Sequence, residues 1–174
     1  AYYFDHKGVL SMAITGLAAV VGFSSSPQGM LNNDFSSDQF LAISSILLGM
    51  SLVAISHLAD RKGIKTHFSF TYRHFALHFI ALPCLANMLH DNFWIYLIVL
   101  APAMYYFYRQ AYHDKSVLFL FFTLFYSYIA LNIQLGRLLA NTDLAMALVY
   151  LMPFYFGGSI ALFIRVLKSF KKEI

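Results

Sequence analysis

The sequence predicts an all-α integral membrane protein, a bundle of six transmembrane helices. Of the 174 residues, 60% are apolar and 11% are charged, and the mean hydropathy is +0.65. Because soluble domains carry roughly 25% charged residues, this chain has too little charge to cover its own surface in water. We therefore expect residues 1–174 to form a single transmembrane domain.

Long apolar runs mark the expected spanning helices, since a helix needs roughly 20 mostly apolar residues to cross a bilayer. Polar or turn-forming residues separate these runs. The six runs cover residues 8–24, 39–59, 70–90, 93–112, 116–137 and 144–167. Gly63 follows the second run, where a glycine can end a helix in the left-handed conformation.

The basic residues are distributed unevenly over the two sides of such a bundle. Eleven of the twelve fall on one side, namely Lys7, Arg61, Lys62, Lys65, Arg73, Arg109, Lys115, Arg165, Lys168, Lys171 and Lys172. Only Arg137 falls on the other side. The positive-inside rule then places both termini in the cytoplasm, and we expect the membrane to be the bacterial inner membrane. The net charge of +4 follows this topology, so it does not indicate a nucleic-acid partner.

The cytoplasmic turns resemble one another. Asp60-Arg61-Lys62-Gly63-Ile64 matches residues 5–9 (Asp-His-Lys-Gly-Val) and, more loosely, residues 113–117 (His-Asp-Lys-Ser-Val). The lysines of these turns lie 55 and 53 residues apart, which predicts three repeated helical hairpins of about 55 residues. The alternative is that any short turn needs a cap and a lysine. The repeat also makes residues 1–4 the end of an earlier helix, so we expect the chain to be the C-terminal part of a longer protein.

The third run and its surroundings carry a candidate polar cluster of His57, Arg73, His74 and His78. His74 and His78 are four residues apart and share a helix face, so both imidazoles could reach one metal ion or haem. A metal site needs three or four ligands, and no span contains a glutamate. The sequence therefore predicts no metal and no cofactor. We interpret these side chains as groups that reach toward lipid phosphates or bond to neighbouring helices.

The fifth run carries a candidate polar stripe of Thr123, Ser127, Asn132 and Gln134. Hydroxyl and amide groups at such positions commonly bond between membrane helices, each contributing on the order of 0.6–2 kcal/mol. The stripe therefore predicts helix packing, and the alternative is a solute pathway lined by these groups.

Small residues predict close approach between helices. They occur as Gly16, Ala19 and Gly22 in the first run, as Ser45 with Gly49 in the second, and as Gly157, Gly158 and Ser159 in the sixth.

The sequence favours a protein without catalytic activity. It contains no metal-binding H-E-x-x-H motif, no G-x-S-x-G motif and no phosphate-binding glycine loop. The single Cys84 lies in an apolar run without a nearby base, so it is more typical of a core residue than of a nucleophile.

Three segments resemble a known type of protein. They are the Asp-x-Lys-Gly turns, Phe-Thr-Tyr-Arg-His-Phe-Ala-Leu-His at residues 70–78, and Tyr-Ser-Tyr-Ile-Ala-Leu-Asn at residues 126–132. They are similar to a domain of unknown function in bacterial multi-spanning membrane proteins built from serial helical hairpins. The resemblance implies a longer parent chain, and it brings no established activity and no catalytic residues.

Three functional hypotheses follow. The leading one is a non-catalytic accessory or scaffold subunit of a larger membrane complex, whose partners are the lipid bilayer and other membrane subunits. The alternative is a transporter or channel for a small solute or lipid. The third is a haem- or metal-binding redox membrane protein that uses His57, His74 and His78.

Overall fold

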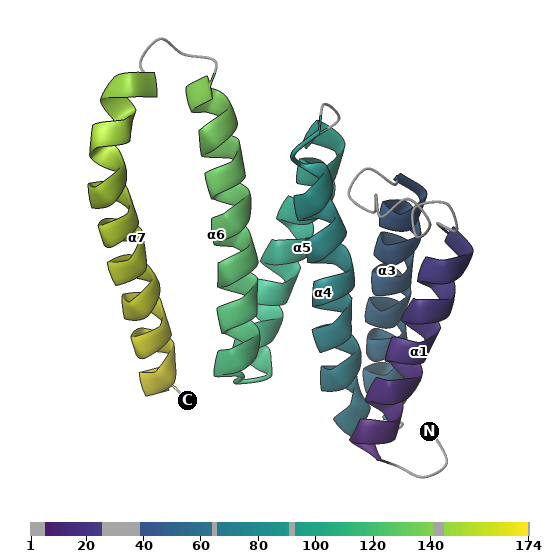
Figure 1. Cartoon of the computed structure of the whole chain (residues 1–174). Helices are drawn as coiled ribbons and strands as arrows, with labels where there is room; N and C mark the ends of the chain where they lie inside the picture. The colour runs from purple at the N-terminus through teal and green to yellow at the C-terminus, as the bar shows by residue number, and fades with distance from the viewer. Residues whose placement is uncertain (1–5, 26–38, 64–65, 91–92, 141–144, 174) are drawn as a thin grey trace. The chain divides into compact units, whose positions relative to one another are not determined.

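The computed structural model describes residues 6–25, 39–63, 66–90, 93–140 and 145–173, and these residues form helices without a strand (Figure 1). In chain order the elements are α1 (Lys7–Ser25), α3 (Gln39–Lys62), the 3-10 helix η1 (Thr66–Phe68), α4 (Ser69–Asn87), α5 (Phe93–His113), α6 (Val117–Ala140) and α7 (Ala145–Glu173). The all-α prediction is confirmed, and each expected run coincides with one α-helix. The first copy of the repeated turn begins at Asp5, outside the described residues.

The chain divides into two compact units, Ala1–Ala103 and Met104–Ile174, and the division falls within α5. The first unit holds α1, α3, η1 and α4, and the second holds α6, α7 and the C-terminal end of α5. Each unit is described by itself below.

The core of the first unit is the interface between α3 and α4, where small residues bring the helices close together. A Cβ atom added to Gly49 would lie 2.6 Å from Cγ1 of Ile80 and 3.2 Å from the carbonyl oxygen of Ala76. One turn away, Oγ of Ser45 donates a hydrogen bond to the carbonyl oxygen of Phe79 at 3.2 Å. The close approach predicted from Ser45 and Gly49 is therefore confirmed.

The pair formed by α6 and α7 in the second unit is built differently, with aromatic side chains between the helices. The rings of Phe121 and Phe163 meet edge to face, with their centroids 5.5 Å apart. A Cβ atom added to Gly157 or Gly158 would meet nothing within 4 Å. Within this unit α7 contacts α6 through bulky rings and leaves both glycines exposed, so the close approach that they permit is not used between these two helices.

The turns that follow α3 and α5 each contain a left-handed residue, Gly63 with φ +63° and Lys115 with φ +49°. The proposed repeat aligns Lys62 with Lys115, which would place Gly63 opposite Ser116. The left-handed residue of the second turn therefore lies one position earlier than the repeat implies. Ser116 instead caps α6, because its Oγ accepts a hydrogen bond from the amide of Phe119 at 3.3 Å.

Two of the described helical segments, Gln39–Lys62 and Val117–Leu138, are long and apolar enough to cross a membrane. A shorter apolar stretch covers Lys7–Gly22. By length and composition, these segments give weak support to a membrane location.

Candidate functional site

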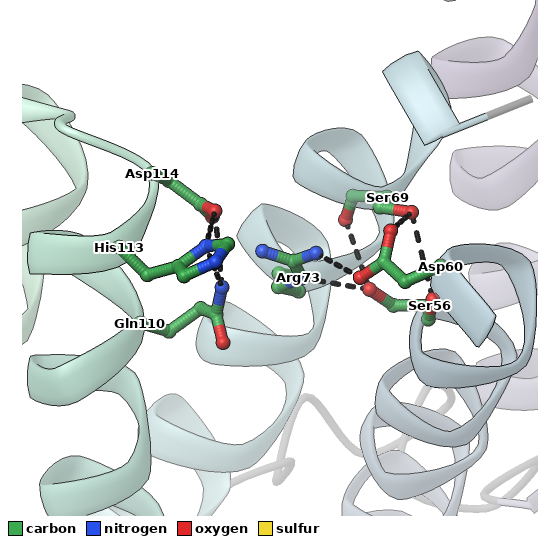
Figure 2. A network of polar contacts seen from close by, with 7 residues as sticks. All are labelled: Ser56, Asp60, Ser69, Arg73, Gln110, His113 and Asp114. Atoms are coloured by element: carbon green, nitrogen blue, oxygen red, sulfur yellow. Dashed lines mark hydrogen bonds and ion pairs between the residues drawn. The ribbon is translucent and has the colours of Figure 1, made fainter. Parts of the chain in front are cut away.

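A buried polar network joins α3 to α4 and is centred on Arg73 (Figure 2). Nε of Arg73 donates a hydrogen bond to Oγ of Ser56 at 2.7 Å, and a terminal guanidinium nitrogen pairs with the carboxylate of Asp60. The Arg73 side chain is 5% exposed and that of Asp60 is 37% exposed. The pair therefore lies at the edge of the helix interface, with the cation inside and the carboxylate partly outside.

The hydroxyls of Ser56 and Ser69 complete this network, and the donor in each of their hydrogen bonds can be assigned. Oγ of Ser56 accepts from Arg73 and donates to the carbonyl oxygen of Ser69 at 3.3 Å. Oγ of Ser69 donates in turn to the carboxylate of Asp60. Because each hydroxyl has a single proton, this arrangement uses both donors and gives the Asp60 carboxylate two charge-stabilising hydrogen bonds.

Helix dipoles explain why the carboxylate of Asp60 is held by α4. Asp60 lies in the last turn of α3, where the partial negative charge of the helix end disfavours a carboxylate. Its hydrogen bond to Ser69 places it at the first turn of α4, where the partial charge is positive. The first turn of α4 has no acidic residue of its own, and the N-cap residue Phe68 makes no side-chain capping bond. Asp60 supplies that negative charge from the preceding helix.

The structure divides the predicted cluster of His57, Arg73, His74 and His78. Arg73 belongs to the buried network, whereas His57 is exposed on α3. His74 and His78 are half-buried on α4, and their rings meet edge to face with centroids 4.9 Å apart. Within the described ranges, no group of three His, Cys, Asp or Glu side chains is arranged to hold a metal ion. His74 and His78 are therefore the two described side chains that could contribute to a metal or haem site, and the structure adds no third ligand to them among the described residues.

The sequence interpretation missed Ser56, Asp60 and Ser69. A signal for Asp60 was present, because an arginine inside an apolar helix needs a counter-ion. Asp60 is the carboxylate nearest to Arg73 in the sequence, thirteen residues earlier. The two serines carried no comparable signal, since serines also occur at many exposed positions.

A second polar group lies at the C-terminal end of α5 and is also drawn in Figure 2. Oδ1 of Asp114 accepts a hydrogen bond from Nε2 of Gln110 at 3.0 Å and lies 3.2 Å from Nδ1 of His113. The His113 side chain is 79% exposed. This group gives the C-terminal end of α5 a local set of polar contacts.

The predicted stripe on α6 makes hydrogen bonds within its own helix. Thr123, Ser127 and Asn132 each donate to the carbonyl oxygen four residues earlier, at 2.9, 2.8 and 2.7 Å. At about 100° per residue, Thr123, Ser127 and Gln134 share one face, and Asn132 lies about 180° from Thr123. Asn132 is therefore not part of a common stripe. Nε2 of Gln134 is buried and makes no hydrogen bond among the described residues.

Tyr128 makes a polar bond that crosses from α6 to α7. Its hydroxyl lies 3.1 Å from Oγ of Ser159. Ser159 already donates its single proton to the carbonyl oxygen of Phe156 at 2.9 Å, so Tyr128 is the donor in the bond between the helices. The two residues line an apolar groove with Phe121, Phe125, Ile160 and Phe163.

These arrangements are those of helix packing, with ion pairs and hydroxyls satisfied locally. The Cys84 side chain is fully buried in the first unit, which is unsuited to a nucleophile that must meet substrate. Comparisons with protein-family models, curated proteins and solved structures gave no match.

Proposed function

We propose that the chain is a polytopic membrane protein whose six α-helices all cross the bacterial inner membrane, with both termini in the cytoplasm. The observation that carries the proposal is the exposure of large apolar side chains on every α-helix. Among them are Phe40 (77% exposed), Ile98 (70%) and Phe154 (80%). Soluble proteins rarely expose large continuous apolar patches, whereas a lipid environment favours such a surface.

The lengths of the remaining helices are compatible with this proposal. Helices α1 and α4 have 19 residues each and α5 has 21, or about 28–32 Å at 1.5 Å per residue. The hydrocarbon core is about 30 Å thick. The hydropathy of α4 is lowered by Arg73, His74 and His78, and α5 is rich in tyrosine. Of these groups, Arg73 is neutralised by Asp60 within the same unit.

Within the membrane, we propose a non-catalytic role as an accessory or scaffold subunit of a larger complex. The buried polar groups between α3 and α4 are engaged by the protein itself, so they serve packing rather than a substrate. The outer surface instead offers bulky apolar and aromatic side chains, including Trp94 (62% exposed) on α5 and Phe156 (41%) on α7. Such a surface suits contact with lipid and with the helices of other subunits.

Native mass spectrometry of the protein extracted in mild detergent tests the accessory role. We expect a defined complex that contains this chain together with other membrane proteins. A lone monomer or a homo-oligomer would contradict that role and leave the membrane location intact.

Cysteine mapping tests the topology. In a Cys84→Ala background, Lys62→Cys and His90→Cys place single thiols at opposite ends of the first unit's helices. An impermeant maleimide added to intact cells should label the His90→Cys variant, and should label the Lys62→Cys variant only after the membrane is broken. The reverse pattern would overturn the proposed orientation. Release of the wild-type protein from membranes by alkaline carbonate would overturn the membrane location itself.

The second candidate is a transporter or channel for a small solute or lipid, and it rests on Gln134. A buried amide without a partner is costly, and its face is shared by Ser127 and Thr123. In the same background, a thiol introduced by Ser127→Cys would react with a water-soluble methanethiosulfonate reagent if this face lines a water-filled pathway. No reaction would favour the accessory role.

A further inference from the structure

The cytoplasmic end of α7 carries a groove whose lining changes from apolar to cationic along the helix. The groove is lined by Ala161, Ile164, Arg165, Lys168 and Ser169. Ala161 and Ile164 are exposed and apolar, while Arg165 and Lys168 are exposed cations one turn apart. Neither cation has an ion-pair partner among the described residues.

The length of α7 places this change at the boundary of the membrane. The helix has 29 residues, or about 44 Å at 1.5 Å per residue, whereas the hydrocarbon core is about 30 Å thick. The excess of about 14 Å corresponds to roughly nine residues. Those residues are the basic C-terminal end of the helix, beginning near Arg165, if α7 enters the membrane at its N-terminal end.

We propose that this groove binds an anionic phospholipid of the cytoplasmic leaflet. Arg165 and Lys168 would engage the headgroup phosphate, and Ala161 and Ile164 would contact the start of an acyl chain. The axial distance from Ala161 to Lys168 is about 10 Å, which spans the transition from hydrocarbon to headgroups. The inference rests on the proposed membrane insertion and goes beyond it by assigning a ligand class and a site.

Charge complementarity favours a lipid over an apolar partner helix. Basic residues next to a spanning helix attract anionic headgroups, and Arg165 suits a phosphate because its guanidinium donates two parallel hydrogen bonds. Ala161 leaves space beside Ile164 where a larger side chain would fill the groove. An apolar helix would leave both cations without a counter-ion.

The test is native mass spectrometry of the full chain in detergent with equal amounts of phosphatidylglycerol and phosphatidylcholine. We expect the wild-type protein to retain phosphatidylglycerol preferentially. The Arg165→Gln and Lys168→Gln variants should each lower the preference about fivefold, and the double variant about thirtyfold. The uncharged change Ala161→Phe should weaken lipid retention by filling the groove.

The matched control is the double variant Arg61→Gln, Lys62→Gln, which removes two exposed cations from the end of α3. It should retain the wild-type preference. Equal loss in this control would assign the preference to general surface charge and overturn the proposed site. An unchanged lipid preference in the α7 variants would also overturn the site. So would variants that lose a bound protein while they keep the lipid. Release of the wild-type protein from membranes by alkaline carbonate would instead overturn membrane insertion.

Discussion

The helix pair α3 and α4 and the helix pair α6 and α7 are packed in different ways. Helices α3 and α4 meet at Gly49, where an added Cβ would lie 2.6 Å from Ile80, and a buried ion pair links them. Helices α6 and α7 are separated by aromatic rings such as Phe121, and the hydroxyl of Tyr128 bonds to Ser159 between them.

The difference shows that a glycine permits close approach but does not cause it. Gly49 lies against the side chain of Ile80 and the backbone of Ala76 on α4, whereas a Cβ added to Gly157 would meet nothing within 4 Å. Because lipid supplies little hydrophobic driving force between helices, close packing and polar bonds determine their association. We therefore expect α3 and α4 to form the more stable pair in a membrane.

The largest expected effect comes from removing the counter-ion of Arg73. The substitution Asp60→Ala leaves a guanidinium that is 5% exposed without its carboxylate. Breaking a buried ion pair costs roughly 3–5 kcal/mol, and we expect about 3 kcal/mol because Asp60 is partly exposed. The measurement is SDS-induced unfolding in mixed micelles, followed by circular dichroism.

The adjacent exposed residue provides the control for this prediction. Arg61→Ala should change the free energy of unfolding by less than about 0.5 kcal/mol. The double variant Asp60→Ala, Arg73→Met should recover part of the loss, because it also removes the cation that has lost its Asp60 partner. If Asp60→Ala unfolds like the wild-type protein, the pair does not stabilise the interface between α3 and α4.

The next effect in size tests the close approach itself. Gly49→Ala adds a Cβ atom against Ile80 and the backbone of Ala76. Overpacking costs typically 1–3 kcal/mol, and the higher helix propensity of alanine returns about 1 kcal/mol. We expect a net loss of up to about 2 kcal/mol in the same unfolding measurement.

Gly157→Ala is the matched change in the other helix pair. Nothing lies within 4 Å of the added atom, so only helix propensity acts, and we expect up to about 1 kcal/mol of stabilisation. The two glycine variants should therefore shift stability in opposite directions. Equal shifts would mean that the packing difference between the two pairs does not exist in the membrane.

Much of the helical fold could be predicted from the sequence, because long apolar runs and turn residues such as Gly63 mark where helices begin and end. The packing of helices was harder to predict. Gly49 and Gly157 look alike in the sequence, and they differ in what lies opposite them: Ile80 and the backbone of Ala76 lie against Gly49, whereas nothing lies within 4 Å of a Cβ added to Gly157. The residues opposite Gly49 lie on another helix, at a sequence distance that periodicity does not reveal.

The candidate site was predicted only in part for a similar reason. Arg73 was identified because a charge within an apolar run is conspicuous. Its partner Asp60 was interpreted as a turn residue, because it belongs to the repeated turn Asp60-Arg61-Lys62-Gly63-Ile64. Asn132 was grouped with Thr123 because both are polar, although helical geometry places them on opposite faces.

The smallest expected effect concerns the bond between α6 and α7. Tyr128→Phe removes the hydroxyl that donates to Ser159 and keeps the ring. Hydrogen bonds between membrane helices average about 0.6 kcal/mol, so we expect a loss of that size. A double-mutant cycle with Ser159→Ala measures the coupling between the two residues. Tyr108→Phe is the control, because its hydroxyl bonds to Tyr112 within α5 and is exposed.

A coupling energy near zero for Tyr128 and Ser159 would mean that their hydroxyl bond does not stabilise the pair of α6 and α7. Ring packing, such as Phe121 against Phe163, would then be the main contact between α6 and α7 among the side chains that the structure describes. Rings that meet edge to face tolerate small sliding movements better than a glycine contact does, because no backbone atoms are in close contact. The pair α6 and α7 would then have less to fix its separation, whereas Gly49 and the ion pair of Arg73 with Asp60 fix that of α3 and α4.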